Sequence, residues 1–204
     1  MVKDDQGSPG EGLPGSQELV VEGVVATVGF CNTGVAAKSI EVFQNAKMPL
    51  LIPWAAGTPL TAKYPGPASY IFRTSARDAI QAPFVVDHIL GKGWDTVAIF
   101  SDTTGYGEAE PSNERRASLL TTYKRNFNQA MAVPMAAAQA YDTTCLLMYA
   151  LFDVRDGQCA ITGPALKAAL EDIKRVYYGV VGNGLITFAN AADAKRNLFV
   201  QRKK

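Results

Sequence analysis

This chain has no long apolar run, no excess of charge of one sign and no metal-like cluster of cysteines, and each absence argues against a class of site or partner. No apolar run approaches the roughly 18 residues of a membrane span, and the amino terminus, MVKDDQGSPGEG, lacks the apolar segment of a secretory signal. A net charge of +1 without a basic cluster argues against nucleic acids and anionic membranes as partners. The three cysteines show no metal-like spacing, and at least one of them must stay unpaired.

Apolar residues make up 48% of the chain, which is ample for a packed core. The segment from Val24 to Thr61 predicts a strand, a polar loop, an amphipathic helix, a second strand and a second loop. Its strands are expected at Val24–Gly29 and Met48–Ile52, each buried on both faces as in parallel sheets. Between them, apolar residues at helical spacing mark the core side of a crossover helix: Ala36, Ile40 and Phe43.

Further helices and strands are expected on both sides of this segment, and together they indicate an α/β fold. The Gly- and Pro-rich stretch Gly7–Gly15 predicts a turn into a short helix that ends near Gly23. Short strands are expected at Tyr70–Arg73 and Thr96–Ser101. Helices are expected at Asp78–Leu90, with Ile80, Phe84 and His88 on one side, at Pro111–Phe127, and around two apolar stripes, Ala137, Tyr141, Cys145, Met148, Phe152 and Leu166, Ala169, Leu170, Ile173. The pair Asn183-Gly184 predicts a hairpin between Val176–Val181 and Leu185–Phe188.

Two loops follow the predicted strands, at the edge where parallel α/β sheets bind their ligands. They are Cys31-Asn32-Thr33-Gly34 and Trp54-Ala55-Ala56-Gly57-Thr58. The first loop also opens a helix, whose free N–H groups and positive dipole end suit a carboxylate. The residues therefore predict a site for a small anion or zwitterion. Two plainer interpretations stay open, with Asn32-Thr33 as a simple helix cap and Trp54 as a core or interface aromatic.

Residue spacing does not support a catalytic or cofactor site. Gly105-Tyr106-Gly107 lacks the third glycine and the downstream acid of a dinucleotide-binding motif. Cys31 and the single histidine, His88, could form a thiol–imidazole pair, but His88 is more simply a structural residue on a helix. No spacing pairs the acidic candidates Asp4, Asp5, Asp102 and Glu108. We therefore expect no enzymatic activity, no cofactor and no metal.

The same residues carry a resemblance to a known family. VVATVGFCNTGVAAKSIEVFQNAKMPLLIPWAAGTPLT, SYIFRTSARDAIQAPFVVDHIL and VAIFSDTTGYGEA resemble the amino-terminal lobe of branched-chain amino-acid-binding proteins, the receptors of ATP-driven (ABC) importers. MAAAQAYDTTCLLMYALF and GPALKAALED resemble the helices by which that family's chain returns to the lobe. The resemblance implies a type I periplasmic-binding fold, with a three-layer, doubly wound, mainly parallel sheet.

This chain departs from the family pattern in three places. Ala109 is followed by Glu110-Pro111-Ser112 where family members enter a second lobe, and a second join lies at Gly182-Asn183. The amino terminus, VKDDQGSP, resembles the end of the family's second strand, so the first strand is expected to be missing. The resemblance therefore implies a single lobe, with residues 1–110 as its first part and residues 111–204 as the returning helices and hairpin.

The resemblance also implies roles for the loops. Asn32-Thr33-Gly34 matches the loop that receives the ligand's α-carboxylate, and Ala55-Ala56 matches an Ala-Thr pair that contacts the amino-acid backbone. Ala56 lacks the threonine hydroxyl, which argues against tight binding. Tyr106-Gly107-Glu108 matches the hinge between lobes, while the second-lobe acid and aromatics have no counterpart.

The expected function is solute recognition for the import of branched-chain or other aliphatic amino acids or amides, in a form that binds weakly or not at all. The implied partners are the small ligand and the membrane subunits of an ABC importer, in the periplasm or its extracytoplasmic equivalent. Self-association through unpaired strand edges is also expected. The alternative is a cytoplasmic amide- or amino-acid-sensing regulator of the same fold, because the chain as written carries no signal segment.

Overall fold

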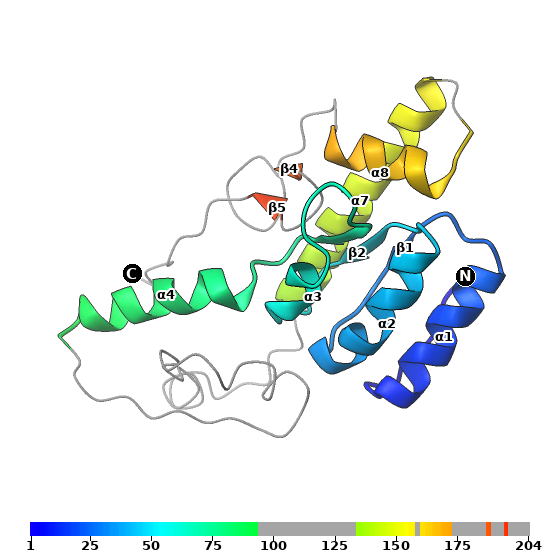
Figure 1. The fold of residues 1–204 in the computed structure, drawn as a ribbon. Coiled ribbons are helices and arrows are strands. Elements are labelled where there is room, and N and C mark those ends of the chain that lie inside the picture. Colours follow the sequence, from blue (N-terminus) through cyan, green and yellow to red (C-terminus); the bar gives the residue numbers. More distant parts are fainter. Residues whose placement is uncertain (94–133, 158–159, 173–186, 189–193, 196–204) are drawn as a thin grey trace.

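The structure is a computed structural model that describes residues 1–93, 134–157, 160–172, 187–188 and 194–195 (Figure 1). The helices and strands of the first stretch are α1 (Pro9–Val21), β1 (Thr27–Val28), α2 (Thr33–Asn45), β2 (Leu50–Ile52), α3 (Pro59–Ala62), β3 (Ile71–Arg73) and α4 (Asp78–Leu90). Those of the later stretches are α7 (Pro134–Asp156), α8 (Gly163–Glu171), β4 (Thr187–Phe188) and β5 (Ala194–Lys195).

Strands β1, β2 and β3 form a parallel sheet in that order, with Thr27 opposite Leu50 and Leu50 opposite Ile71. Because side chains alternate along a strand, the sheet sends neighbouring residues into two different cores. Leu51 and Phe72 pack with α7 and α8, whereas Leu50, Ile52 and Ile71 pack with α2. Figure 1 shows the sheet between these two groups of helices, and the arrangement is the predicted three-layer α/β fold.

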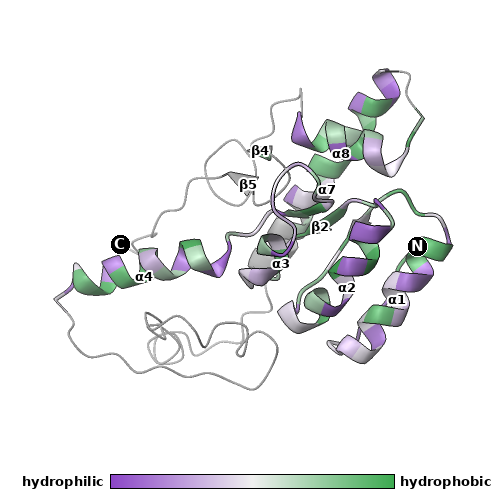
Figure 2. Cartoon of the chain, in the orientation of Figure 1, coloured by the Kyte–Doolittle hydropathy of each residue, from purple (hydrophilic) through white to green (hydrophobic). Residues whose placement is uncertain are grey.

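The apolar pattern of the crossover helix is confirmed. Ala36, Ile40 and Phe43 on α2 are 0–2% exposed and face the sheet residues Leu50 and Ile52. Figure 2 shows hydrophobic residues concentrated on β2 in the middle of the body, while α1 and α2 alternate between hydrophobic and hydrophilic turns. Burial of one stripe, rather than intrinsic propensity, is what holds such a helix in place.

Helix α1 is longer than its glycines and prolines suggested. The prediction of a turn through Gly7–Gly15 was wrong beyond Ser8, because helix begins at Pro9. Ser8 caps the helix by accepting a hydrogen bond from the Gly10 N–H, and proline at the first helical position is favourable. Gly12 lies against α2, so close that a Cβ there would stand 2.2 Å from Val35 Cγ1. Tertiary packing has therefore turned a low-propensity segment into helix.

The first strand is shorter and less covered than predicted. Only Thr27 and Val28 of the expected Val24–Gly29 pair with β2, and Val28 is 36% exposed. The expectation of burial on both faces was wrong because β1 is an edge strand of the described sheet. Residues 1–5, which resembled the end of a strand, form no strand; Lys3 instead pairs with Glu18 on α1.

Helix α4 has the predicted bounds. Ile80 and Phe84 are 43% and 39% exposed, and Ile89 is the buried residue of the helix. Figure 1 shows α4 extending away from the sheet instead of lying along it.

The buried side of helix α7 differs from the predicted one. Its buried residues Leu146, Ala150 and Val154 recur every four positions, whereas Met148 of the predicted stripe is 47% exposed. On α8 the predicted side is borne out at Leu166 and Leu170, both fully buried.

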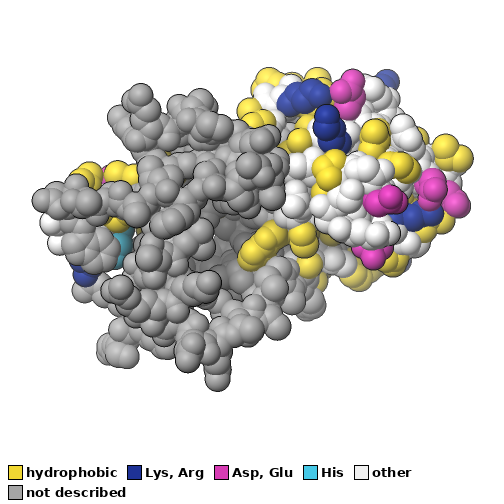
Figure 3. All heavy atoms as spheres, turned by 90° about the horizontal axis from the view of Figure 1, so that it is seen from below, with side chains coloured by type: hydrophobic (Ala, Val, Ile, Leu, Met, Phe, Trp, Pro, Cys, Tyr) yellow, Lys and Arg dark blue, Asp and Glu magenta, His cyan; other side chains and the backbone are white. Residues whose placement is uncertain are grey.

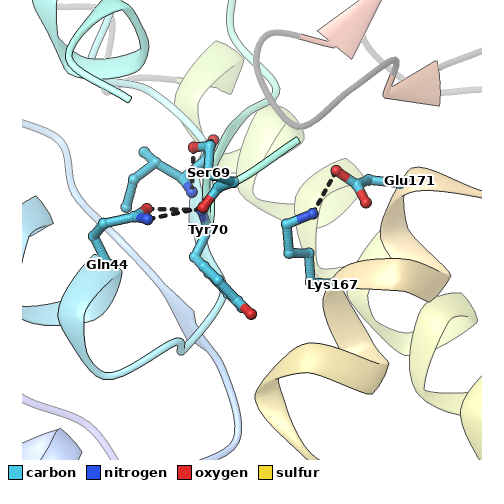
Figure 4. Close-up of polar contacts among 7 residues, drawn as sticks. Gln44, Ser69, Tyr70, Lys167 and Glu171 are labelled. Carbon is cyan, nitrogen blue, oxygen red and sulfur yellow. Dashed lines mark hydrogen bonds and ion pairs between the residues drawn. The ribbon is translucent and has the colours of Figure 1, made fainter. Parts of the chain in front are cut away.

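Helix α8 is anchored at the amino ends of the strands, opposite the predicted ligand loops. A Cβ on Gly163 would stand 1.9 Å from the Lys47 carbonyl oxygen, so the helix begins in tight contact with the turn before β2. Figure 4 shows Lys167 of α8, whose Nζ lies 2.7 Å from Glu171 Oε1 and 5.7 Å from the centre of the Tyr70 ring. Gln44 of α2 accepts from the Tyr70 N–H at 2.8 Å and donates to the Ala68 carbonyl at 2.9 Å.

Several predicted elements lie outside the described residues. They are the strand Thr96–Ser101, the helix Pro111–Phe127 and the strand Val176–Val181. β4, at the end of the predicted Leu185–Phe188 strand, pairs antiparallel with β5, and Phe188 packs edge-to-face on Phe72 at 5.2 Å.

Candidate functional site

Three loops meet at the carboxyl edge of the parallel sheet, one after each strand. The Ala55 N–H donates to the Phe30 carbonyl at 3.3 Å, which ties the loop after β2 to the loop after β1. The Asp78 N–H donates to the Ala56 carbonyl at 3.0 Å, which ties the same loop to the chain after β3. The two loops predicted from the sequence are therefore neighbours, and a third loop, residues 74–77, lies beside them.

The first loop caps helix α2. Asn32 Oδ1 accepts from the Gly34 N–H at 2.8 Å and from the Val35 N–H at 3.4 Å. These are two of the donors that a helix terminus leaves without a partner inside the helix. The capping interpretation thus describes the local structure, and an anion at this terminus would share its donors with Asn32. Cys31, just before the cap, is exposed with a free thiol.

The second loop packs against the start of α2. The Gly57 N–H donates to Thr33 Oγ1 at 3.3 Å, and a Cβ on Gly57 would stand 2.3 Å from Thr33 Cγ2. Only glycine allows this approach, so glycine at 57 is required by contact with Thr33. Trp54 and Thr58 are half-buried at the two ends of the loop, and Ala55 is 2% exposed.

The third loop was missed by sequence reasoning, although the same rule about strand ends applies to it. Thr58 Oγ1 accepts from the Ala79 N–H at 3.0 Å, so the second loop also contacts the first turn of α4. Thr74 shares a hydrogen bond of 2.5 Å with Thr143 of α7, and both side chains are fully buried. The polar pair Thr74-Ser75 after a predicted strand was a usable signal; nothing local pointed to Thr143.

A buried arginine lies beneath the second loop. Arg73, the last residue of β3, is 0% exposed and donates from Nη1 to the Gly57 carbonyl at 2.7 Å. Its Nη2 donates to Thr61 Oγ1 of α3 at 2.9 Å. Sequence reasoning missed this residue as well, because a charged residue at the end of a strand is ordinarily expected to face solvent.

The remaining predicted residues are not part of this edge as far as the structure describes it. Tyr106, Gly107 and Glu108, predicted as a hinge, lie outside the described residues. His88 is in the last turn of α4, while Cys31 precedes α2. Within the described stretches, no group of three or more histidine, cysteine or acidic residues has the arrangement of a metal site. No helix among them is long and apolar enough to cross a membrane.

A family model described as periplasmic binding protein matches residues 1–109, which include all three loops. The chain belongs to this family. A Leu/Ile/Val-binding protein homologue of Brucella melitensis biotype 1 is 33% identical over 106 residues, 52% of this chain. That match spans 28% of the relative's own length, so the relative is much longer than the part this chain shares with it.

Solved structures of substrate-binding proteins share the fold. An ABC transporter substrate-binding protein from Desulfitobacterium hafniense, in complex with Leu, superposes with a TM-score of 0.68 at 16% identity, covering 96% of this chain and 82% of the other. A branched-chain amino acid transporter substrate-binding protein from Streptococcus pneumoniae, in complex with isoleucine, gives 0.52 at 16% identity, covering 96% and 86%. At such identities the likeness shows the fold alone. The predicted family and the α/β fold of a type I periplasmic-binding lobe are both confirmed.

Proposed function

We propose that this chain is a ligand-recognition lobe of an ABC-type import receptor for branched-chain or other aliphatic amino acids or amides. The observation that carries the proposal is the joined edge of loops 31–34 and 54–58 in a chain of the periplasmic binding protein family. The names of its relatives support the ligand class, since one is a Leu/Ile/Val-binding homologue and others were solved with Leu and isoleucine. The proposed role involves no covalent chemistry.

The ligand site of the proposal is one wall rather than an enclosed pocket. The positive end of α2 favours the ligand's carboxylate, and half-buried Trp54 offers an apolar surface for its side chain. Small ligands gain most of their affinity from enclosure, so a single wall gives weak binding. In the proposal, residues 1–110 and 111–204 complete one lobe, which works in the periplasm or an equivalent compartment with the importer's membrane subunits as partners.

A titration followed by NMR tests the proposal. L-leucine should shift the backbone amides of residues 31–34 and 54–58 in the 204-residue protein, and D-leucine should shift them less. Trp54→Ala should abolish the shifts, whereas Phe84→Ala, which removes an exposed aromatic from α4, should not. Shifts confined to α7 and α8, or equal shifts with both enantiomers, would contradict the proposed site.

A further inference from the structure

Arg73 places a buried cation directly under the second ligand loop. Alternation along β3 puts its side chain on the same face as Ile71, toward α2, and none of it is exposed. Burying a charged group is costly unless its donors are hydrogen-bonded. Two of the guanidinium nitrogens meet acceptors on different segments, the Gly57 carbonyl and the Thr61 hydroxyl.

Both backbone polar groups of Gly57 are hydrogen-bonded. Its N–H reaches Thr33 at the start of α2, and its carbonyl accepts both from Arg73 and, at 3.2 Å, from the Leu60 N–H. The close approach of Gly57 to Thr33 leaves the loop little room to shift toward α2. Arg73 therefore connects β3 and α3 to the loop whose residues were predicted to contact ligand.

We infer that Arg73 is a positioning residue of the ligand site, which holds the Trp54–Thr58 loop in place before a ligand arrives. The inference rests on the proposed function for the ligand, but the contacts that hold the loop are independent of it. A planar guanidinium donates in two fixed directions, which a lysine ammonium on a flexible stem does not reproduce. A loop ordered in advance does not have to be ordered on binding, and this raises affinity.

The test compares Arg73→Lys and Arg73→Met with two controls in the 204-residue protein. Ile71→Val trims the same strand and face two residues earlier, away from the loop. Lys63→Met removes an exposed cation just after α3 that pairs with Glu41. For each protein, amide hydrogen exchange of Gly57 and Leu60 is measured without ligand, thermal melting reports global stability, and NMR titration reports the affinity for L-leucine.

Both Arg73 variants should speed amide exchange at Gly57 and Leu60 at least tenfold more than at Phe43 in the core. Both should also weaken the binding of L-leucine at least tenfold. Both controls should leave the ratio of these exchange rates and the leucine affinity unchanged. If Arg73→Met does not fold, two single variants supply the same comparison. They are Arg73→Lys and Thr61→Val, the second of which removes one acceptor of the Arg73 guanidinium.

Three outcomes would overturn the inference. They are an unchanged exchange ratio in the Arg73 variants, an equal change in Ile71→Val, and faster loop exchange without any loss of leucine affinity. If the unaltered protein fails to bind leucine, the proposed function fails, and the exchange ratio alone then decides whether Arg73 positions the loop.

Discussion

Ala56 in the second loop has no side-chain group that could form a hydrogen bond with a ligand. Its carbonyl accepts from the Asp78 N–H, and its methyl side chain provides no hydrogen bond. The side chain is half-buried at the edge where the loops meet, and in the proposed site a hydroxyl added there would face the ligand. The residue therefore limits affinity in the proposed site.

Ala56→Thr should strengthen leucine binding by about 1 kcal/mol, the net worth of one hydrogen bond, which is roughly fivefold in the dissociation constant. NMR titration measures the change. Ala37→Thr, on an exposed position of α2, is the matched control and should leave the affinity unaltered. Equal effects of the two substitutions would show that Ala56 does not face the ligand.

Lys63 makes the folding stability of the protein depend slightly on pH in the alkaline range. Its Nζ lies 3.0 Å from Glu41 Oε2, and the hydrogen bond to Glu41 raises the lysine pKa above its usual 10.5, with a further contribution from Tyr64. A pKa raised by folding means that the ion pair stabilises the protein below pH 10.5 and that this is lost as the pH rises through the raised pKa. Because both side chains are largely exposed, the effect is small.

Lys63→Gln should therefore lower Tm slightly near neutral pH, and the difference should vanish above the raised pKa. Thermal melts of the two proteins across this range provide the measurement. Lys38→Gln is the control, since Lys38 is exposed on α2 and makes no ion pair within the described residues. A difference in Tm that persists at the alkaline end would mean that Lys63 contributes by packing instead of charge.

At the scale of elements, the crossing of α1 and α2 depends on one glycine of the three in α1. Gly12 is buried, and a Cβ there would stand 2.2 Å from Val35 Cγ1. Gly15, one turn later, has its nearest contact at 3.6 Å, from Lys3 Cβ, which is an ordinary distance. The two residues share a helix and differ in what a methyl group would meet.

Gly12→Ala should destabilise the protein by about 1–3 kcal/mol, because overpacking forces the helices apart. Gly15→Ala should instead stabilise it by about 0.5–1 kcal/mol, the gain in helix propensity. Chemical denaturation of both variants measures the two effects. If both substitutions stabilise the protein, the helices do not cross as closely as described.

At the scale of the whole molecule, the described sheet ends on a strand with apolar residues in reach of solvent. Val28 in β1 and Val25 just before it are 36% and 38% exposed, and Val21 at the end of α1 is 86% exposed. Figure 3 shows charged side chains of both signs mixed with apolar ones on the described part of one face. Exposed edge strands of this kind are templates for pairing with another chain.

We therefore expect the protein to be marginally stable and to self-associate through β1. Val28→Lys should reduce association, because a charge on an edge strand opposes pairing, whereas Ala37→Lys on exposed α2 should not. Sedimentation and thermal melting provide the measurements. A monodisperse monomer that melts sharply above about 65 °C would contradict the expectation.

Sequence patterns predicted the structure correctly where the interactions that decide it lie within a few residues of one another. The bounds of α4 and the buried side of α2 were predicted, since helical periodicity is read along the chain itself. The buried side of α7 was not, because it includes Thr143, a polar residue whose place in the core depends on a hydrogen bond to Thr74 far away in sequence. For α4 the periodicity placed Ile80 and Phe84 on one side of the helix, and only the structure shows that both are exposed.

By itself the sequence determined the family, the alternation of strands and helices, and the edge of the sheet where the two predicted loops lie, because these follow from residue order and local periodicity. Tertiary structure alone decided how the loops are held. Gly57 contacts Thr33 and Arg73, and Ala56 contacts Asp78, only because parallel strands bring residues 16 to 24 positions apart to one edge. Such contacts depend on strand register, and no local pattern of residues encodes register across a crossover helix.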